Sequence, residues 1–215
     1  MTEVITHFGT IQTLVSSLQA IEERVDANGA WYVVRGSGLA AATLLILLML
    51  SGIGQVTGLT YRLLEPVKAW AVHKAMALAL CACIVLHVTG LLLDHYITFS
   101  WLQVLVPFTS QYSNGARLFG VSWAAWGVAL GILATYGIAI TVLSSLRWID
   151  TKKKTWRWLH YLNYVVMLCV FLHGLIVGTD LKKGVWRSVW VAFVLLVAVG
   201  VVSRLRRTRT LKTGV

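Results

Sequence analysis

Four of the six histidines form two pairs with nearly the same spacing along the chain. His73 and His87 are 14 residues apart, and His160 and His173 are 13 residues apart. On an α-helix with a rise of 1.5 Å per residue, the members of each pair lie about 20 Å apart. Imidazole is a common metal ligand, and two imidazoles that face each other can clamp one iron from opposite sides. The spacing therefore predicts two iron sites at two levels of a helical protein.

The elements that must carry these histidines are long apolar stretches. Of the 215 residues, 58% are hydrophobic and only 13% are charged, and the mean hydropathy is +0.75. Soluble domains carry about 25% charged residues, so these values exclude an ordinary soluble domain. A bilayer core takes about 20 apolar residues of helix. We expect five spans, at residues 36–54, 75–93, 118–146, 158–179 and 188–203.

These stretches predict an all-α integral membrane protein with five transmembrane helices, because they are too long for strands and do not alternate. Before the first stretch, apolar residues recur at helical spacing without the basic start of a signal peptide. We expect residues 1–28 to form an amphipathic interfacial helix and residues 29–204 to form the membrane domain. Residues 205–215 would be a basic cytoplasmic tail.

The basic residues indicate the orientation of the chain. The 19 Lys and Arg residues exceed the 8 Asp and Glu residues, which gives a formal net charge of +11, and they gather at the ends of the apolar stretches. This placement indicates a lipid bilayer as the partner and no nucleic acid. Thirteen basic residues fall on one side of the membrane and six on the other. The positive-inside rule predicts a multi-pass cell-membrane protein with a cytoplasmic C-terminus and an extracytoplasmic N-terminus.

In this orientation the second and fourth spans both run outward from the cytoplasm. His73 and His160 then share the inner depth, while His87 and His173 share the outer depth. Ionisable residues within a bilayer are costly, so matching pairs favour two bis-histidine haems over simple hydrogen bonds between helices. Thirteen residues place the second ligand of the fourth span about 140° away from the first on an ideal helix. A π-bulge, a kink or a different approach angle must absorb this offset.

Two segments resemble the ferric-reductase-like transmembrane domain, which ferric-chelate reductases, NADPH oxidases and the bacterial haem subunit serving methionine-sulfoxide reductase share. They are HKAMALALCACIVLH and HYLNYVVMLCVFLH. The basic segment LSSLRWIDTKKKTWRWLHYLNY also resembles the loop that leads into the second histidine helix of that family. The resemblance covers about residues 31–203. It implies a helical bundle that binds two b-type haems and passes electrons outward.

Two features depart from that family. NADPH oxidases and eukaryotic ferric reductases continue into flavin and nicotinamide domains, whereas only twelve residues follow Ser203 here. The amphipathic segment also replaces the first helix of the six-span relatives. We therefore expect that either a separate cytoplasmic flavoprotein reductase or membrane quinol donates the electrons. An extracytoplasmic acceptor would receive the electrons, so the chain would be the electron-transfer subunit of an oxidoreductase.

Several side chains near the two levels have more than one interpretation. Arg35 could pair with the anionic propionates of the outer haem, or it could snorkel to the interface. Lys74 and Arg157, next to the inner histidines, could serve the inner haem or only fix the topology. His95 could bind the acceptor or lie at the surface. We expect the aromatic loop 96–117 to cover the outer haem.

Two other functions compete with this one. The first is a quinol-fed haem subunit that hands electrons to an extracytoplasmic partner reductase. The second is a haem-free membrane scaffold or transporter whose histidines relay protons or bind a metal. Transporters usually show an internal repeat of their spans, and here the two histidine helices are repeat-like only in the spacing of their histidines. An absorption spectrum distinguishes the haem-free scaffold or transporter from the two hypotheses in which the chain binds haem.

Overall fold

The computed structural model describes the backbone of residues 2–95, 97–113, 115–181 and 184–213. Within these ranges, it leaves the side chains of residues 2–14, 18, 20–27, 205 and 207–213 undescribed. Helices dominate the described chain, with one short hairpin between them. In order, the elements are α1 (Thr2–Thr57), a 3-10 turn (η1, Thr60–Arg62), α2 (Pro66–Leu93), α3 (Trp101–Leu105), β1 (Arg117–Leu118), β2 (Val121–Ser122), α4 (Trp123–Trp148), α5 (Lys153–Val177) and α6 (Val185–Thr213).

Five of these helices are long and apolar enough to cross a membrane, which confirms the prediction of an all-α integral membrane protein. The spans agree with those expected from the sequence, although most are longer at one or both ends. The last span, for which we expected sixteen residues, has 20 residues. The candidate spans are Asn28–Thr57, Pro66–Leu93, Trp123–Trp148, Lys153–Val177 and Val185–Arg204.

The expected start of the third span at residue 118 was wrong. Residues 117–122 form a two-stranded antiparallel hairpin instead, and α4 begins at Trp123. The turn of this hairpin contains Gly120, which has a φ of 78°. A positive φ is easily adopted by glycine and is incompatible with a continuing right-handed helix. The apolar character of the segment did not reveal this turn.

Local signals explain why the first two spans form a tight helical hairpin. Gly58 follows the last residue of α1 with a φ of 78°, the left-handed conformation that commonly ends a helix. Pro66 is the first residue of α2, where its fixed φ suits a helix and its missing N–H costs no hydrogen bond. The short connection brings α1 and α2 back against each other.

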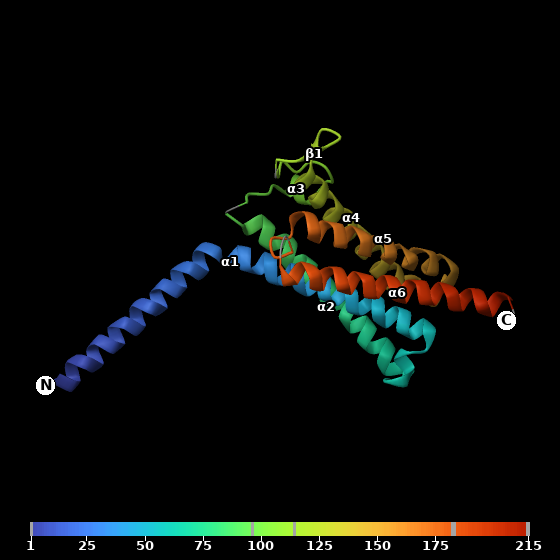
Figure 1. The fold of residues 1–215 in the computed structure, drawn as a ribbon, viewed down its shortest axis with the longest axis horizontal. Helices are drawn as coiled ribbons and strands as arrows, with labels where there is room; N and C mark the ends of the chain where they lie inside the picture. Colours follow the sequence, from blue (N-terminus) through green and yellow to red (C-terminus); the bar gives the residue numbers. More distant parts are fainter. Residues whose placement is uncertain (1, 96, 114, 182–183, 214–215) are drawn as a thin grey trace.

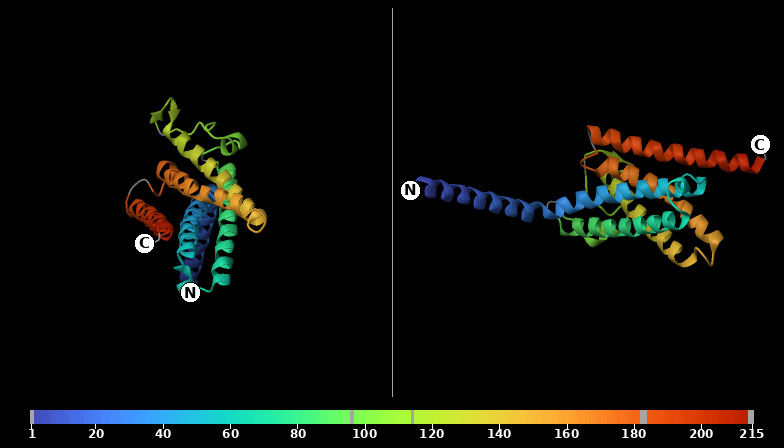
Figure 2. Two further views of the ribbon diagram at one scale, coloured as in Figure 1. Left: turned by 90° about the vertical axis from the view of Figure 1, so that its right-hand side faces the viewer. Right: turned by 90° about the horizontal axis from the view of Figure 1, so that it is seen from below.

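The bundle consists of two helical hairpins, α1 with α2 and α4 with α5, and α6 packs against α1. The connections after α1 and α4 lie at one end of the bundle, and the connections after α2 and α5 lie at the other (Figure 1). The α4–α5 hairpin crosses the α1–α2 hairpin at an angle (Figure 2). This arrangement places α2 and α5 so that both run in the same sense between the two ends.

The N-terminal part of α1 continues the first span without a break and extends away from the other helices (Figures 1 and 2). The sequence predicts a helix here, and the backbone is helical from Thr2 onward. Most side chains of residues 1–28 and of the predicted tail 205–215 lie outside the described residues. The interfacial position of the first segment and the division into these regions therefore stay predictions.

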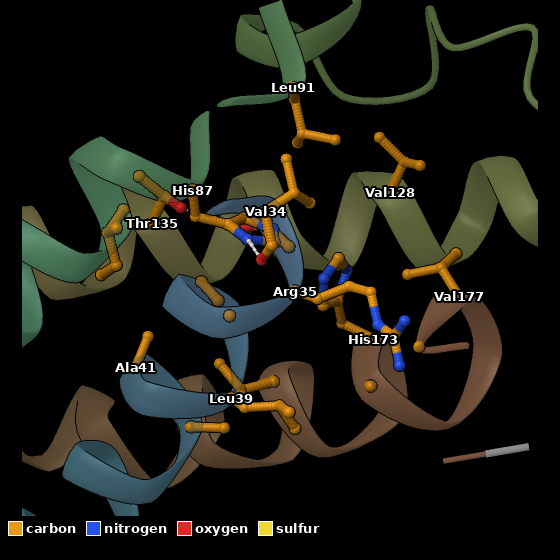
Figure 3. Close-up of a pocket in the computed structure, with 18 of the residues that line it drawn as sticks. Val34, Arg35, Leu39, Ala41, His87, Leu91, Val128, Thr135, His173 and Val177 are labelled. Carbon is orange, nitrogen blue, oxygen red and sulfur yellow. Dashed lines mark hydrogen bonds between the residues drawn. The ribbon is translucent and has the colours of Figure 1, made fainter. Parts of the chain in front are cut away.

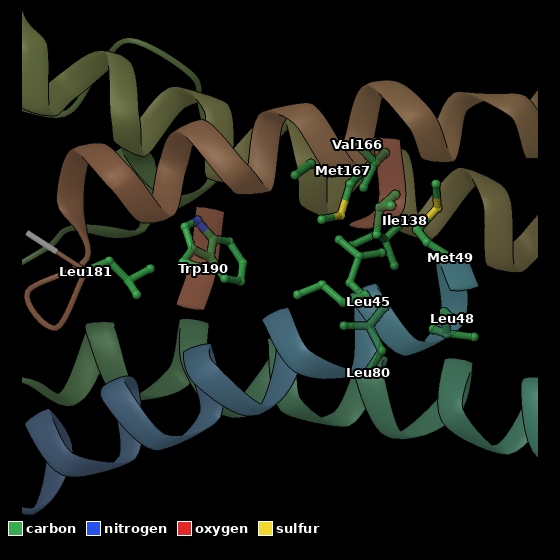
Figure 4. Packing of buried hydrophobic residues seen from close by; sticks show 12 residues of the cluster. Leu45, Leu48, Met49, Leu80, Ile138, Val166, Met167, Leu181 and Trp190 are labelled. Carbon is green, nitrogen blue, oxygen red and sulfur yellow. The ribbon is translucent and has the colours of Figure 1, made fainter. Parts of the chain in front are cut away.

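The apolar core lies between the two levels of the histidines. Leu80 is seven residues from His73 and from His87 along α2, and Met167 occupies the corresponding middle of α5. Leu45 of α1 and Ile138 of α4 pack into the same cluster (Figure 4). These buried side chains form an apolar layer that separates the inner pair of histidines from the outer pair.

Candidate functional site

The structure brings the four histidines together in two pairs, each with one residue from α2 and one from α5. The ring centres of His73 and His160 lie 6.4 Å apart, and those of His87 and His173 are also 6.4 Å apart. All four side chains are partly buried. The structure thus has the juxtaposition that the sequence predicts, whereas the role of these rings as haem ligands stays a prediction.

The spacing of the rings fits one metal ion between each pair. An imidazole nitrogen binds a transition metal at about 2 Å, so rings on opposite sides of one ion have centres roughly 6 Å apart. Both observed separations, 6.4 Å, agree with that value. Among the described residues, no group of three or more His, Cys, Asp or Glu side chains could hold a metal ion. Each pair therefore offers two imidazole rings, the number that a haem held between two histidines would need, and its role as a haem site stays a prediction.

Hydrogen bonds to backbone carbonyls orient both outer rings. Nδ1 of His87 lies 2.8 Å from the carbonyl oxygen of Val34 in α1, and Nδ1 of His173 lies 2.8 Å from that of Gly127 in α4. A carbonyl oxygen can only accept, so each Nδ1 carries a proton and donates it, and Nε2 of the neutral ring keeps its lone pair. Metal-binding histidines usually make such a bond through their second nitrogen. The outer rings thus fit the ligand role.

The inner rings have different surroundings. Nδ1 of His73 lies 3.2 Å from Oγ of Ser51, and the amide nitrogen of Gln55 donates to the same Oγ at 3.2 Å. Nδ1 of His160 is buried without a hydrogen-bond partner among the described residues. Its ring centre lies 5.3 Å from that of Trp156, one turn earlier in α5. Side chains, and not backbone carbonyls, therefore surround the inner pair.

A cavity of about 270 Å³ adjoins the outer pair. Both His87 and His173 line it, and Figure 3 shows them with Val34 and Arg35 of α1 nearby. The loop after α2 also contributes to the wall, which agrees with the expectation that residues 96–117 cover this side. Its lining residues are Ile97, Phe99, Val104 and Tyr112.

Two glycines make room for the outer rings. A Cβ at Gly131 of α4 would lie 2.7 Å from Nδ1 of His173, closer than real Cβ atoms approach other atoms. A Cβ at Gly38 of α1 would lie 3.0 Å from Nδ1 of His87. Each ring therefore rests against a helix backbone at a position where a side chain would force it to move. The outer pair is a fitted site and not an accidental contact.

Arg35 reaches the outer cavity, where its charge is paired with a residue that sequence reasoning missed. Its guanidinium forms an ion pair with the carboxylate of Asp180, with Nε 2.9 Å from Oδ2. It also lies 4.0 Å from the ring centre of Trp31. Both Arg35 and Asp180 line the cavity. The rarity of acidic residues in the chain was the one signal for Asp180, and a propionate role for Arg35 stays a prediction.

The basic residues expected near the inner pair are exposed. Lys74 and Arg157 both extend into the surroundings of the bundle, and their role toward an inner haem stays a prediction. The structure adds Arg204, at the inner end of the last span, which donates a hydrogen bond to the hydroxyl of Tyr164. The charge of Arg204 also lies within electrostatic range of His160. Sequence reasoning placed Arg204 at the edge of the tail, although its depth matched that of the inner histidines.

Comparison with known proteins identifies one family. The family model described as ferric reductase like transmembrane component matches residues 37–171, more than half of the chain. The matched range includes His73, His87 and His160 and ends two residues before His173. Domains of this family usually bind haem and are associated with electron transfer across a membrane. No curated protein and no solved structure matches the chain.

Proposed function

The chain belongs to the ferric reductase like transmembrane family, and we propose that it is a b-type cytochrome that carries electrons across the membrane through two haems. In this proposal His73 and His160 hold the inner haem, and His87 and His173 hold the outer one. The observation that carries the proposal is the separation of 6.4 Å between the rings of both pairs. When bound, haem supplies one-electron redox chemistry at its iron.

The histidines prepare both sites for electron transfer. The bonds from His87 and His173 to backbone carbonyls at 2.8 Å keep Nε2 unprotonated and hold each ring in one orientation. A haem held by a histidine from each of α2 and α5 would have no open position for a substrate, so these sites would favour electron transfer. Leu80 and Met167 belong to an apolar cluster that would keep the surroundings of both haems poor in polar groups.

The direction of transfer and the partners complete the proposal. The excess of basic residues supports a cytoplasmic position for the inner pair, where a separate flavoprotein reductase would supply electrons. The acceptor would bind outside, near the cavity that adjoins His87 and His173. Phe99 and Tyr112 of the loop after α2 line that cavity and would contact such an acceptor. Membrane quinol is the alternative donor.

Removal of one inner ligand tests the proposed function. We expect the purified protein to show a reduced b-type spectrum and two haems per chain. His73→Ala and His160→Ala should each lower this number to one, because a single imidazole leaves one face of the iron without a ligand. Haem content is measured by the pyridine haemochrome assay. His95→Ala is the matched control, since His95 is exposed and belongs to neither pair.

Proteoliposomes then test the transfer itself. With ferricyanide outside, wild-type protein should pass electrons from an enclosed NADPH-dependent flavoprotein, and both inner variants should not. Replacing the flavoprotein with a quinol separates the two donors. A colourless wild-type protein from haem-replete cells would contradict the proposal and favour a haem-free scaffold. Two haems retained in His73→Ala would show that the pairs are not the ligand sets.

A further inference from the structure

The four candidate ligand rings differ in what their second nitrogen contacts. The outer rings donate to backbone carbonyls, which no side-chain substitution removes. Nδ1 of His73 instead lies 3.2 Å from the hydroxyl oxygen of Ser51, one helix away in α1. Among these contacts it is the one made to a side chain, so it can be changed without altering a ligand.

The direction of this hydrogen bond follows from the ligand role. If Nε2 of His73 faces an iron, the neutral ring carries its proton on Nδ1, which must then donate to Oγ of Ser51. The side-chain nitrogen Nε2 of Gln55, on the next turn of α1, also donates a hydrogen bond to this Oγ, at 3.2 Å. A hydroxyl oxygen has two acceptor sites, and these two donors occupy both of them. Gln55 thereby holds the Ser51 hydroxyl in the orientation that accepts from the ring.

We propose that Ser51, held by Gln55, is a positioning residue for the inner haem that orients His73 and sets the electron-donating strength of its Nε2. The inference rests on the proposed function, because it assigns His73 as an iron ligand. A hydrogen bond accepted from the Nδ1–H group increases the basicity of the ligand nitrogen Nε2, and such outer partners are known to tune metal sites. A more basic ligand stabilises the oxidised iron, which lowers the reduction potential.

The effect belongs to the inner site and to one side of it. His160, the opposite ligand, has no hydrogen-bond partner at Nδ1 among the described residues. Ser51 therefore polarises the ring of His73, whereas the ring of His160 has no such partner among the described residues. Gly52, the residue after Ser51, also faces the ring, because a Cβ built there would lie 3.6 Å from Cε1 of His73.

A redox titration of the Ser51→Ala variant tests this role. We expect two haems per chain, an upward shift of the inner midpoint potential and an unchanged outer potential. The His160→Ala variant, which retains the outer haem alone, identifies which potential belongs to which site. Ser51→Thr keeps the hydroxyl and should restore the wild-type value. Gln55→Leu should shift the inner potential in the same direction by less, because it frees the hydroxyl without removing it.

Thr43→Ala is the matched control, since the hydroxyl of Thr43 lies on the exposed side of α1 and bonds to the carbonyl of Leu39. Unchanged potentials in Ser51→Ala with both haems bound would overturn the inference and leave the proposed function intact. A shift of the outer potential alone would overturn it as well. Loss of the inner haem in Ser51→Ala with retention in Ser51→Thr would support it. A wild-type protein without haem would overturn the proposed function and this inference together.

Discussion

The guanidinium of Arg35 shows how one charged residue can connect distant parts of the chain. Its guanidinium lies between the ring of Trp31 and the carboxylate of Asp180, which is 145 residues away in the sequence. The pair joins the first span to the connection between α5 and α6, next to the outer cavity. A lone arginine here would only need to reach the interface, but a paired one also links two parts of the bundle.

We predict that Asp180→Asn lowers the stability of the bundle by roughly 1 kcal/mol. The side chains of Arg35 and Asp180 are 33% and 26% exposed, so solvent screens their attraction in part. Thermal unfolding in detergent, followed by far-UV circular dichroism, measures the change. Glu65→Gln is the control, because the side chains of Lys68 and Glu65 are 67% and 71% exposed and loss of their pair should leave the melting temperature unchanged. Equal effects of the two substitutions would show that the Arg35 pair adds nothing specific.

At the scale of helices, the meeting of α4 and α5 explains two features of the site. Gly127 and Gly131 lie on the face of α4 that meets α5, where they allow close packing and leave space for His173. α5 is α-helical throughout Lys153–Val177, so no π-bulge absorbs the 13-residue spacing of its histidines. The two hairpins cross, so the direction from α5 toward α2 rotates along the helix (Figure 2). This crossing changes the angle at which the two rings approach α2, which is one of the expected ways to accommodate the offset.

Gly127→Ala should destabilise the contact between these helices by about 1–3 kcal/mol. Its Cβ would lie 2.7 Å from side-chain atoms of Ile176 and of Val177, which have little room to move. The same unfolding measurement in detergent reports the loss. Gly36→Ala serves as the control, because nothing lies within 4 Å of a Cβ at that position. A melting temperature equal to that of the control would contradict the close packing.

At the scale of the whole molecule, the alternation of the ends fixes the levels of the two pairs. Every second connection lies at the same end of the bundle, so α2 and α5 run in the same sense (Figure 1). The excess of Lys and Arg predicts which end faces the cytoplasm. That assignment decides which pair receives electrons first, and therefore the direction of the proposed transfer.

Labelling of cysteines introduced at the two ends tests this orientation. A membrane-impermeant maleimide should modify Ser113→Cys in intact cells, because residue 113 is exposed in the outer loop. Thr151→Cys, exposed in the turn between α4 and α5, should react only after the cells are opened. The unsubstituted protein is the control, since its three cysteines lie within the spans. The reverse labelling pattern would invert the direction of transfer.

The number of spans and the two levels of the histidines follow from residue order alone. Hydropathy is a local property, and a constant rise per residue converts the 14 residues between His73 and His87 directly into depth. Depth in turn identified His160 and His173 as their partners before any contact was known. The start of α4 escaped this reasoning, because the turn at Gly120 depends on backbone conformation within an apolar segment.

The side chains that contact the two histidine pairs and their neighbours are known from the helix packing alone. Asp180 meets Arg35, and Ser51 meets His73, because distant helices pack together, and no periodicity along one helix records such a contact. The crossing of the hairpins likewise depends on side-chain packing between them. The spacing of the histidines along each helix thus sets the depth of each pair. The packing of the helices sets which side chains contact those histidines.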